Sequence, residues 1–241
     1  MTAGTWRELY GSDLQALYGL WLVPVVFLLI LVRDLRRHRA AEPADAFLRT
    51  YALVFTLETI LDPFAGGPLV RWLGLGDGLG ATLVMFLFVL IFGVDAMRAG
   101  RPLRSAIVEA ALWTLIVPIA TAVVHRTLTV VYGALPGQAL WLVYELGFLL
   151  LTLVLWRIVL VRRIGDVHTR EYLAAVLLYV AVYYALWAVA DVLILTTGAD
   201  AAWALRIVPN QLYYGLYVPF VYALWFARRY AATSRSVQAS R

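Results

Sequence analysis

The stretch LYGLWLVPVVFLLILVRDLRRHR, residues 17–39, decides the fold class. Its apolar part is long enough to cross the hydrocarbon core of a bilayer, about 30 Å thick, as a helix. The arginine-rich end RDLRRHR, residues 33–39, is typical of a stop-transfer signal. No basic region precedes the apolar part and no small-x-small cleavage site follows it, so the pattern predicts a retained membrane span over 15–32 rather than a signal peptide.

The composition extends this prediction to the whole chain. Of its 241 residues, 63% are hydrophobic and only 15% are charged, and the mean hydropathy is +0.81. A soluble domain of this size carries about 25% charged residues, because it needs a charged shell. The apolar residues also come in long blocks, which is typical of a polytopic helical membrane protein. We expect spans over 15–32, 47–63, 81–97, 105–125, 138–160, 172–195 and 206–227.

The arginines orient the predicted bundle. All the basic residues are arginine, and they gather in alternate connections, at 33–49, 98–104, 162–170 and 228–241. The other connections and the N-terminus carry single arginines, namely Arg7, Arg71, Arg126 and Arg206. The positive-inside rule therefore predicts an outer N-terminus and a cytoplasmic C-terminus. The expected fold class is an all-α, seven-transmembrane-helix bundle, with one domain over 1–230 and a disordered cytoplasmic tail over 231–241.

The residue inventory excludes several classes of protein. The chain has no cysteine, so disulfides, thiolate metal sites and cysteine nucleophiles are absent. The layout is similar to that of microbial rhodopsins, but the chain has no lysine to form a retinal Schiff base. Histidine pairs of the HExxH type and a GxSxG elbow are also missing, so we expect no catalytic residue, no metal and no cofactor. We expect no nucleic-acid partner, because the arginines lie where membrane topology places them.

Polar groups gather in the outer half of the predicted bundle. The stretch FTLETILDPF, residues 55–64, places Glu58 and Asp62 four residues apart, on one face of the second span. The depth of each group follows from a rise of about 1.5 Å per residue. The same reasoning brings polar groups of five helices to the outer leaflet. The candidate ligand-binding residues are Glu58, Asp62, Glu145, Asp191, Asn210, Gln211, Arg126, Arg206, Tyr184, Trp187 and Tyr214.

Buried acids need partners, since an ionisable group in lipid costs several kcal/mol. Arg126 and Arg206 are the nearby cations, so we expect them to neutralise the outer acids. A carboxylate-only Mg²⁺ or Ca²⁺ site on the outer side is an alternative that only geometry decides. In the inner half, Asp95 and Glu109 lie close in sequence to Arg98 and Arg104, which predicts ion pairs at helix ends. Few other polar groups are expected between Glu58 and the inner arginines.

These patterns favour a small transporter or permease with a polar, aromatic-lined cavity in the outer half. The alternative is a non-transporting receptor, sensor or accessory subunit that binds a ligand or partner at the same residues. A third hypothesis is an intramembrane enzyme acting on lipid-linked substrates, although the absence of a motif makes a non-enzyme the preferred interpretation. We expect the lipid bilayer and a small-molecule or ion ligand from the outer side as partners. Homo-oligomers and a partner membrane subunit are left open, and the expected location is a bacterial inner membrane.

Overall fold

The computed structural model describes residues 4–12, 14, 19–64 and 80–227. Within these ranges the chain is helical and forms no β-strand, as predicted for an all-α protein. The tail predicted over 231–241 lies outside the described residues, and so does the side chain of Asp62.

The described helices follow one another along the chain in the order of their labels. They are α1 (Thr5–Tyr10), α2 (Leu20–Arg37), α3 (Pro43–Phe64), α5 (Gly80–Arg98), α6 (Leu103–Tyr132), α7 (Gly137–Val154), α8 (Val161–Arg163), α9 (Val167–Thr197) and α10 (Ala201–Asn210). Two π-helical segments, η4 (Leu155–Leu160) and η5 (Gln211–Leu216), continue α7 and α10, and residues 217–227 extend η5 as an α-helix. Each predicted span falls within one of these helical runs, except that residues 15–18 lie outside the described ranges.

Local signals set the helix ends. The carboxylate of Asp166 accepts a hydrogen bond from the backbone N–H of Thr169 at 2.9 Å and so caps the start of α9. Gly198 ends the same helix with a φ of 64°, a left-handed conformation that glycine adopts without steric cost. The span predicted over 172–195 stops short of both residues, since the hydropathy pattern ends before the caps.

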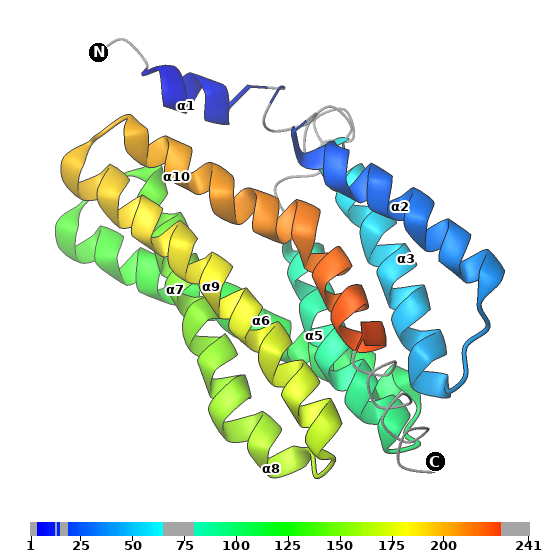
Figure 1. The fold of residues 1–241 in the computed structure, drawn as a ribbon. Helices are drawn as coiled ribbons and strands as arrows, with labels where there is room; N and C mark the ends of the chain where they lie inside the picture. The colour runs from blue at the N-terminus through cyan, green and yellow to red at the C-terminus, as the bar shows by residue number, and fades with distance from the viewer. Residues whose placement is uncertain (1–3, 13, 15–18, 65–79, 228–241) are drawn as a thin grey trace.

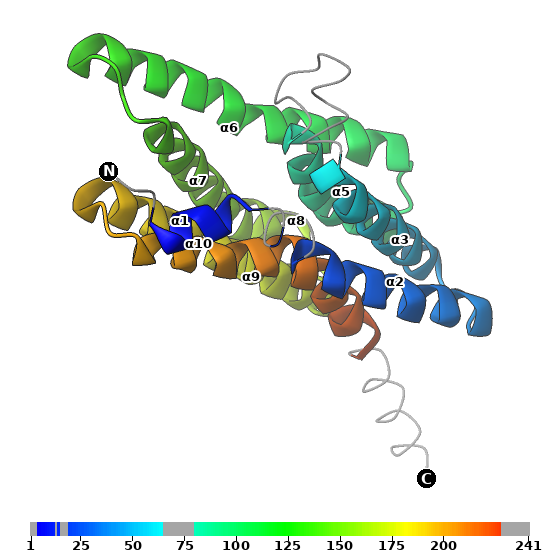
Figure 2. The same ribbon diagram turned by 90° about the horizontal axis from the view of Figure 1, so that it is seen from above.

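The helices pack in chain order and close into a ring. α2 packs on α3, α3 on α5, α5 on α6, α6 on α7, α7 on α9 and α9 on α10, and η5 returns to α2. Figures 1 and 2 show the α10–η5 segment passing from α9 across to α2. The short helix α1 lies along α10 at one end of the bundle. Residues from both ends of the chain therefore meet around α10.

The interior of the bundle is aromatic. Its largest fully buried side chains include Phe55, Phe88, Phe92, Phe148, Tyr172, Tyr183 and Tyr217. The outward faces are apolar as well, and on α6 the side chains of Leu112 and Ile119 are 64% and 61% exposed. Three helical runs, Leu103–Tyr132, Gly137–Arg163 and Val167–Thr197, are long and apolar enough to cross a membrane.

Candidate functional site

Three buried charged groups of the described structure lie where α7, α9 and α10 meet. Arg206 on α10 binds Asp191 on α9 through Nη1, and its Nη2 lies 3.4 Å from Oε1 of Glu145 on α7. Arg206 is 7% exposed, Glu145 3% and Asp191 0%. The three groups come from three different helices, and their burial strengthens every electrostatic interaction among them.

Two further residues complete what we call the ionic cluster: Glu145, Asp191, Arg206, Gln138 and Tyr10. The Gln138 amide donates from Nε2 to Oδ1 of Asp191 at 2.7 Å. The Tyr10 hydroxyl of α1 accepts from Nε of Arg206 at 3.2 Å, and the guanidinium carbon lies 5.5 Å from the Tyr10 ring centroid. Sequence reasoning missed both residues. Gln138 precedes Glu145 by two helical turns on the same face, which is a signal that could have identified it.

The ionic cluster carries an imbalance of charge. Two carboxyl groups face one guanidinium, while Gln138 and Tyr10 are neutral. Oε2 of Glu145 and Oδ2 of Asp191 are buried and have no hydrogen-bond partner among the described residues. Buried polar atoms are normally hydrogen-bonded, so bare carboxylate oxygens mark a place for a further positive charge or donor.

Polar and aromatic contacts continue from the ionic cluster along α9 and the α10–η5 segment. We call the side chains that make them, Trp187, Asn210, Tyr183 and Tyr213, the ladder. Trp187, one turn before Asp191, donates its indole N–H to Oδ1 of Asn210 at 2.9 Å. Tyr183, one turn earlier still, packs against Tyr213 with ring centroids 5.4 Å apart. The spacing of four residues on α9 keeps these side chains on one face, directed at the neighbouring helix.

The remaining predicted aromatic residues border this ladder. The ring of Tyr184 lies 5.7 Å from that of Trp187, and Tyr214 packs edge-on against Tyr213 at 4.9 Å. Glu58 of α3 is half-buried and lies close enough to Tyr213 for its charge to act on the phenol. The structure therefore brings Glu58, Tyr184 and Tyr214 to the ladder rather than to the ionic cluster.

Three predicted residues take other places. Gln211 donates from Nε2 to the backbone carbonyl of Gly19 at 3.1 Å and so ties η5 to the start of α2. Arg126 is exposed, and in the described part of the chain it forms no ion pair, so Arg206 alone supplies the pairing that we expected from both arginines. Asp62 lies in α3, but its side chain is outside the described residues.

A second group of charges lies near the other end of the bundle. We call Asp95, Arg101, Glu109 and Arg163 the inner cluster. Arg163 binds Asp95 through Nε at 2.6 Å and Glu109 through both terminal nitrogens, Nη2 at 2.8 Å, while Arg101 also pairs with Asp95. The expected pairing with Arg98 and Arg104 is wrong for Asp95 and Glu109, because Arg163 reaches them from a distant helix and Arg98 pairs with Glu42 instead.

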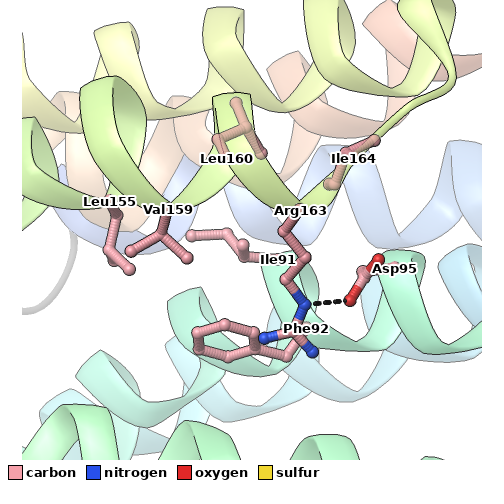
Figure 3. A pocket seen from close by; sticks show the side chains of 8 residues that line it. All are labelled: Ile91, Phe92, Asp95, Leu155, Val159, Leu160, Arg163 and Ile164. Carbon is pink, nitrogen blue, oxygen red and sulfur yellow. Dashed lines mark hydrogen bonds and ion pairs between the residues drawn. The ribbon is translucent and has the colours of Figure 1, made fainter.

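Figure 3 shows a small pocket beside the inner cluster, at the π-helical segment η4. Its walls are Ile91, Phe92, Asp95, Leu155, Val159, Leu160, Arg163 and Ile164. Its internal volume of about 10 Å³ holds no more than one water molecule. The inner cluster contains two acids and two arginines, so its charges balance, and it serves as a matched contrast to the ionic cluster.

The inner half also holds more polar contacts than we expected. Aromatic side chains of the segment that follows α10 bond to helices α2 and α3. These contacts join Tyr217 to Tyr51, Tyr222 to Asp34 and Trp225 to Asp45. The sequence does not reveal them, because tyrosine and tryptophan are counted as apolar in a hydropathy pattern while their O–H and N–H groups still seek partners.

Comparisons of the chain with protein-family models, with curated proteins and with solved structures found no match. Among the described residues, no group of three or more His, Cys, Asp or Glu side chains is placed to hold a metal ion. The ionic cluster can bind a small cation or exchange a proton, since both add the positive charge that its bare oxygens lack.

Proposed function

We propose that the chain is a membrane protein of seven spans with an outer N-terminus and a cytoplasmic C-terminus. Three helical runs with the length and hydropathy of membrane spans support this topology. The exposed apolar side chains along α6 support it too, because a contiguous face of this kind destabilises a protein in water but not in lipid. The alternation of arginine-rich connections supports the orientation.

The topology has a sharp test, since the chain contains no cysteine. Single cysteines placed at Ala134 and Gly165 form a matched pair, because both positions are exposed and lie in connections at opposite ends of the bundle. We expect a membrane-impermeant maleimide to label Ala134→Cys in intact cells and to label Gly165→Cys only after the membrane is opened. Labelling of both positions in intact cells would rule out the proposed topology.

Within this topology we propose that the protein is a small transporter or permease. The observation that carries the proposal is the ionic cluster, a buried and charge-imbalanced group that continues inward as the ladder of Trp187, Asn210, Tyr183 and Tyr213. Ionisable groups inside membrane helices are expensive and are retained mainly along ion or substrate pathways. The inner contacts of Tyr217, Tyr222 and Trp225 extend the polar groups toward the cytoplasmic end.

A second candidate function is a non-transporting receptor or accessory subunit. The observation that favours it is the dense aromatic packing below the ionic cluster, where Tyr183, Tyr184, Trp187 and Tyr213 contact one another with ring centroids 4.7 to 5.7 Å apart. A bundle packed in this way binds a ligand at one end without passing it through.

A measurement of solute transport distinguishes the transporter from the non-transporting receptor. Purified protein in liposomes is placed in iso-osmotic solutions of small organic cations, amino acids or sugars, and solute entry is followed as swelling by light scattering. We expect entry of one class above the rate of empty liposomes, with loss of that entry in Asp191→Asn. Arg126→Gln is the matched control, because this exposed arginine lies outside the ionic cluster and its loss should leave entry unchanged. No entry of any class by a folded, correctly inserted protein would favour the receptor.

A further inference from the structure

The ionic cluster contains two acidic groups and one basic group. Glu145, Asp191 and Arg206 are all more than nine-tenths buried. If both acids were ionised, one negative charge would stay uncompensated in the interior. The penalty for such a charge in a protein is several kcal/mol, and a carboxyl group avoids it by taking up a proton.

The two acids of the ionic cluster differ in their hydrogen bonding. Oδ1 of Asp191 accepts from Arg206 and from Gln138, and two donors stabilise the ionised form. Within the described ranges, the one charged partner of Glu145 is the Nη2 atom of Arg206 at 3.4 Å, which is long for a charge-assisted hydrogen bond. Of the two acids, Glu145 is the one whose ionised form has less support.

The two acids also lie close to each other, because they contact neighbouring nitrogens of one guanidinium, Nη2 and Nη1 of Arg206. Each acid has a buried oxygen without a hydrogen-bond partner among the described residues. Two ionised carboxylates only accept hydrogen bonds, so a bond between them requires a proton on one of them. A proton on Glu145 supplies a donor where the structure otherwise has two bare acceptors.

Among the described residues, Arg206 is the one cation that forms an ion pair with either acid. Arg206 on α10 and Asp191 on α9 are the charged groups that act on Glu145, and Tyr144 and Tyr184 are nearby neutral phenols. Tyr10 of α1 contacts Arg206 rather than the acids. On α6, which packs against α7, the titratable and charged groups in the same half are His125, Arg126 and Tyr132, and in the described structure none of them forms an ion pair with Glu145.

We propose that the ionic cluster binds one exchangeable proton, held on Glu145 and shared with Asp191. The proton comes from water, forms an O–H bond with the Glu145 carboxylate and leaves the cluster electrically neutral. Its release would return one negative charge to the site, so binding of a cation would be coupled to loss of the proton. In the proposed transport site, the proton would be the ion that regulates cation binding. This coupling rests on the proposed function, whereas the presence of the proton does not.

The test uses infrared spectroscopy of the whole protein in detergent, where transport plays no part. We expect a C=O stretching band of a protonated, buried carboxylic acid at neutral pH, and we expect Glu145→Gln to remove it. Asp191→Asn should remove it as well, since Glu145 then becomes the sole counter-ion of Arg206 and ionises. Glu109→Gln is the matched control and should leave the band in place, because Glu109 belongs to the charge-balanced inner cluster. Gel filtration checks that each variant is folded.

Other outcomes would overturn the proposal. A wild-type protein without the band has no such proton, and a band that persists in Glu145→Gln assigns it to another residue. A band that survives in Asp191→Asn contradicts the argument from charge balance. Loss of the band in sodium chloride but not in choline chloride, with a sodium-dependent rise in Tm, would instead support the coupling of cation binding to loss of the proton. None of these results depends on whether the liposomes take up solute, so the two proposals fail separately.

Discussion

Replacing Arg206 by glutamine tests the energetic argument for the ionic cluster. The change keeps a long polar side chain but removes the single positive charge that faces Glu145 and Asp191. Removing one partner of a buried ion pair costs about 3–5 kcal/mol, because the remaining charge stays buried without compensation. The lost hydrogen bond to Tyr10 adds about 1 kcal/mol. We therefore expect Arg206→Gln to lower the free energy of unfolding by at least about 3 kcal/mol at neutral pH.

The pH dependence of this loss has a defined sign. In Arg206→Gln the ionised acid of the cluster has no counter-ion, so the folded state gains stability when that acid binds a proton. The deficit relative to the wild type should shrink as the pH falls and grow as it rises. Arg206→Lys should be less destabilised than the glutamine variant, since it keeps the charge but loses the planar fork that reaches three partners at once.

The assay is unfolding in detergent, followed by tryptophan fluorescence with denaturant or heat. Arg126→Gln is the control, because substitution of an exposed arginine without an ion pair in the described structure should change stability by no more than about 0.5 kcal/mol. An Arg206→Gln variant as stable as this control at neutral pH, or one whose deficit grows as the pH falls, would refute the reasoning.

Three further predictions concern other parts of the fold. Gly93→Ala should destabilise the protein by about 1–3 kcal/mol in the same unfolding assay, because the added Cβ would lie 2.7 Å from Cε2 of the buried Phe47 ring. Gly165→Ala is the control and should be near neutral, because the added Cβ meets open space there. Asp34, just beyond the first predicted span, has a pKa below its usual value: burial alone would raise it, but hydrogen bonds from Tyr222 and His38 and the charge of Arg49 outweigh burial. Its contribution to stability should therefore be complete above the ordinary aspartate pKa of 3.8 and be lost as the pH falls below it, and Asp34→Asn should remove this part of the acid dependence of Tm. Asp200→Asn should loosen α1, since the carboxylate accepts hydrogen bonds from the backbone N–H groups of Trp6 and Arg7 at 2.9 and 3.0 Å; we expect faster hydrogen exchange of residues 5–10, and unchanged exchange would contradict this role.

The sequence predicted the helical runs well because their signals are local. Long apolar blocks act through neighbouring residues, and the hydropathy pattern records them directly, whereas the caps Asp166 and Gly198 of α9 lie outside the span predicted over 172–195. The helices extend beyond most predicted spans, since polar residues at a span's ends also join the helix, although a hydropathy pattern stops before them. The two π-helical segments were not predicted, because an extra residue in one turn leaves no mark on apolar periodicity.

The candidate site was only partly predictable. Depth along each span indicated that Glu145, Asp191 and Arg206 lie at a similar level, and the structure brings these three together. Depth does not say which way a side chain faces around its helix axis. That rotation separates Arg126, which is exposed, from Arg206, which is buried, although both lie near the outer ends of predicted spans.

By itself the sequence determined an all-helical chain, the position of its helical runs and the scarcity of charge in its interior. Each of these properties is set by the chemistry of consecutive residues. The tertiary structure decided the partners: Arg206 with two acids from α7 and α9, Gln138 and Tyr10 as additional contacts, and Arg163 rather than Arg104 for Glu109. Partners depend on how helices are rotated and packed against one another, and packing energies are summed over contacts between residues that the sequence keeps far apart.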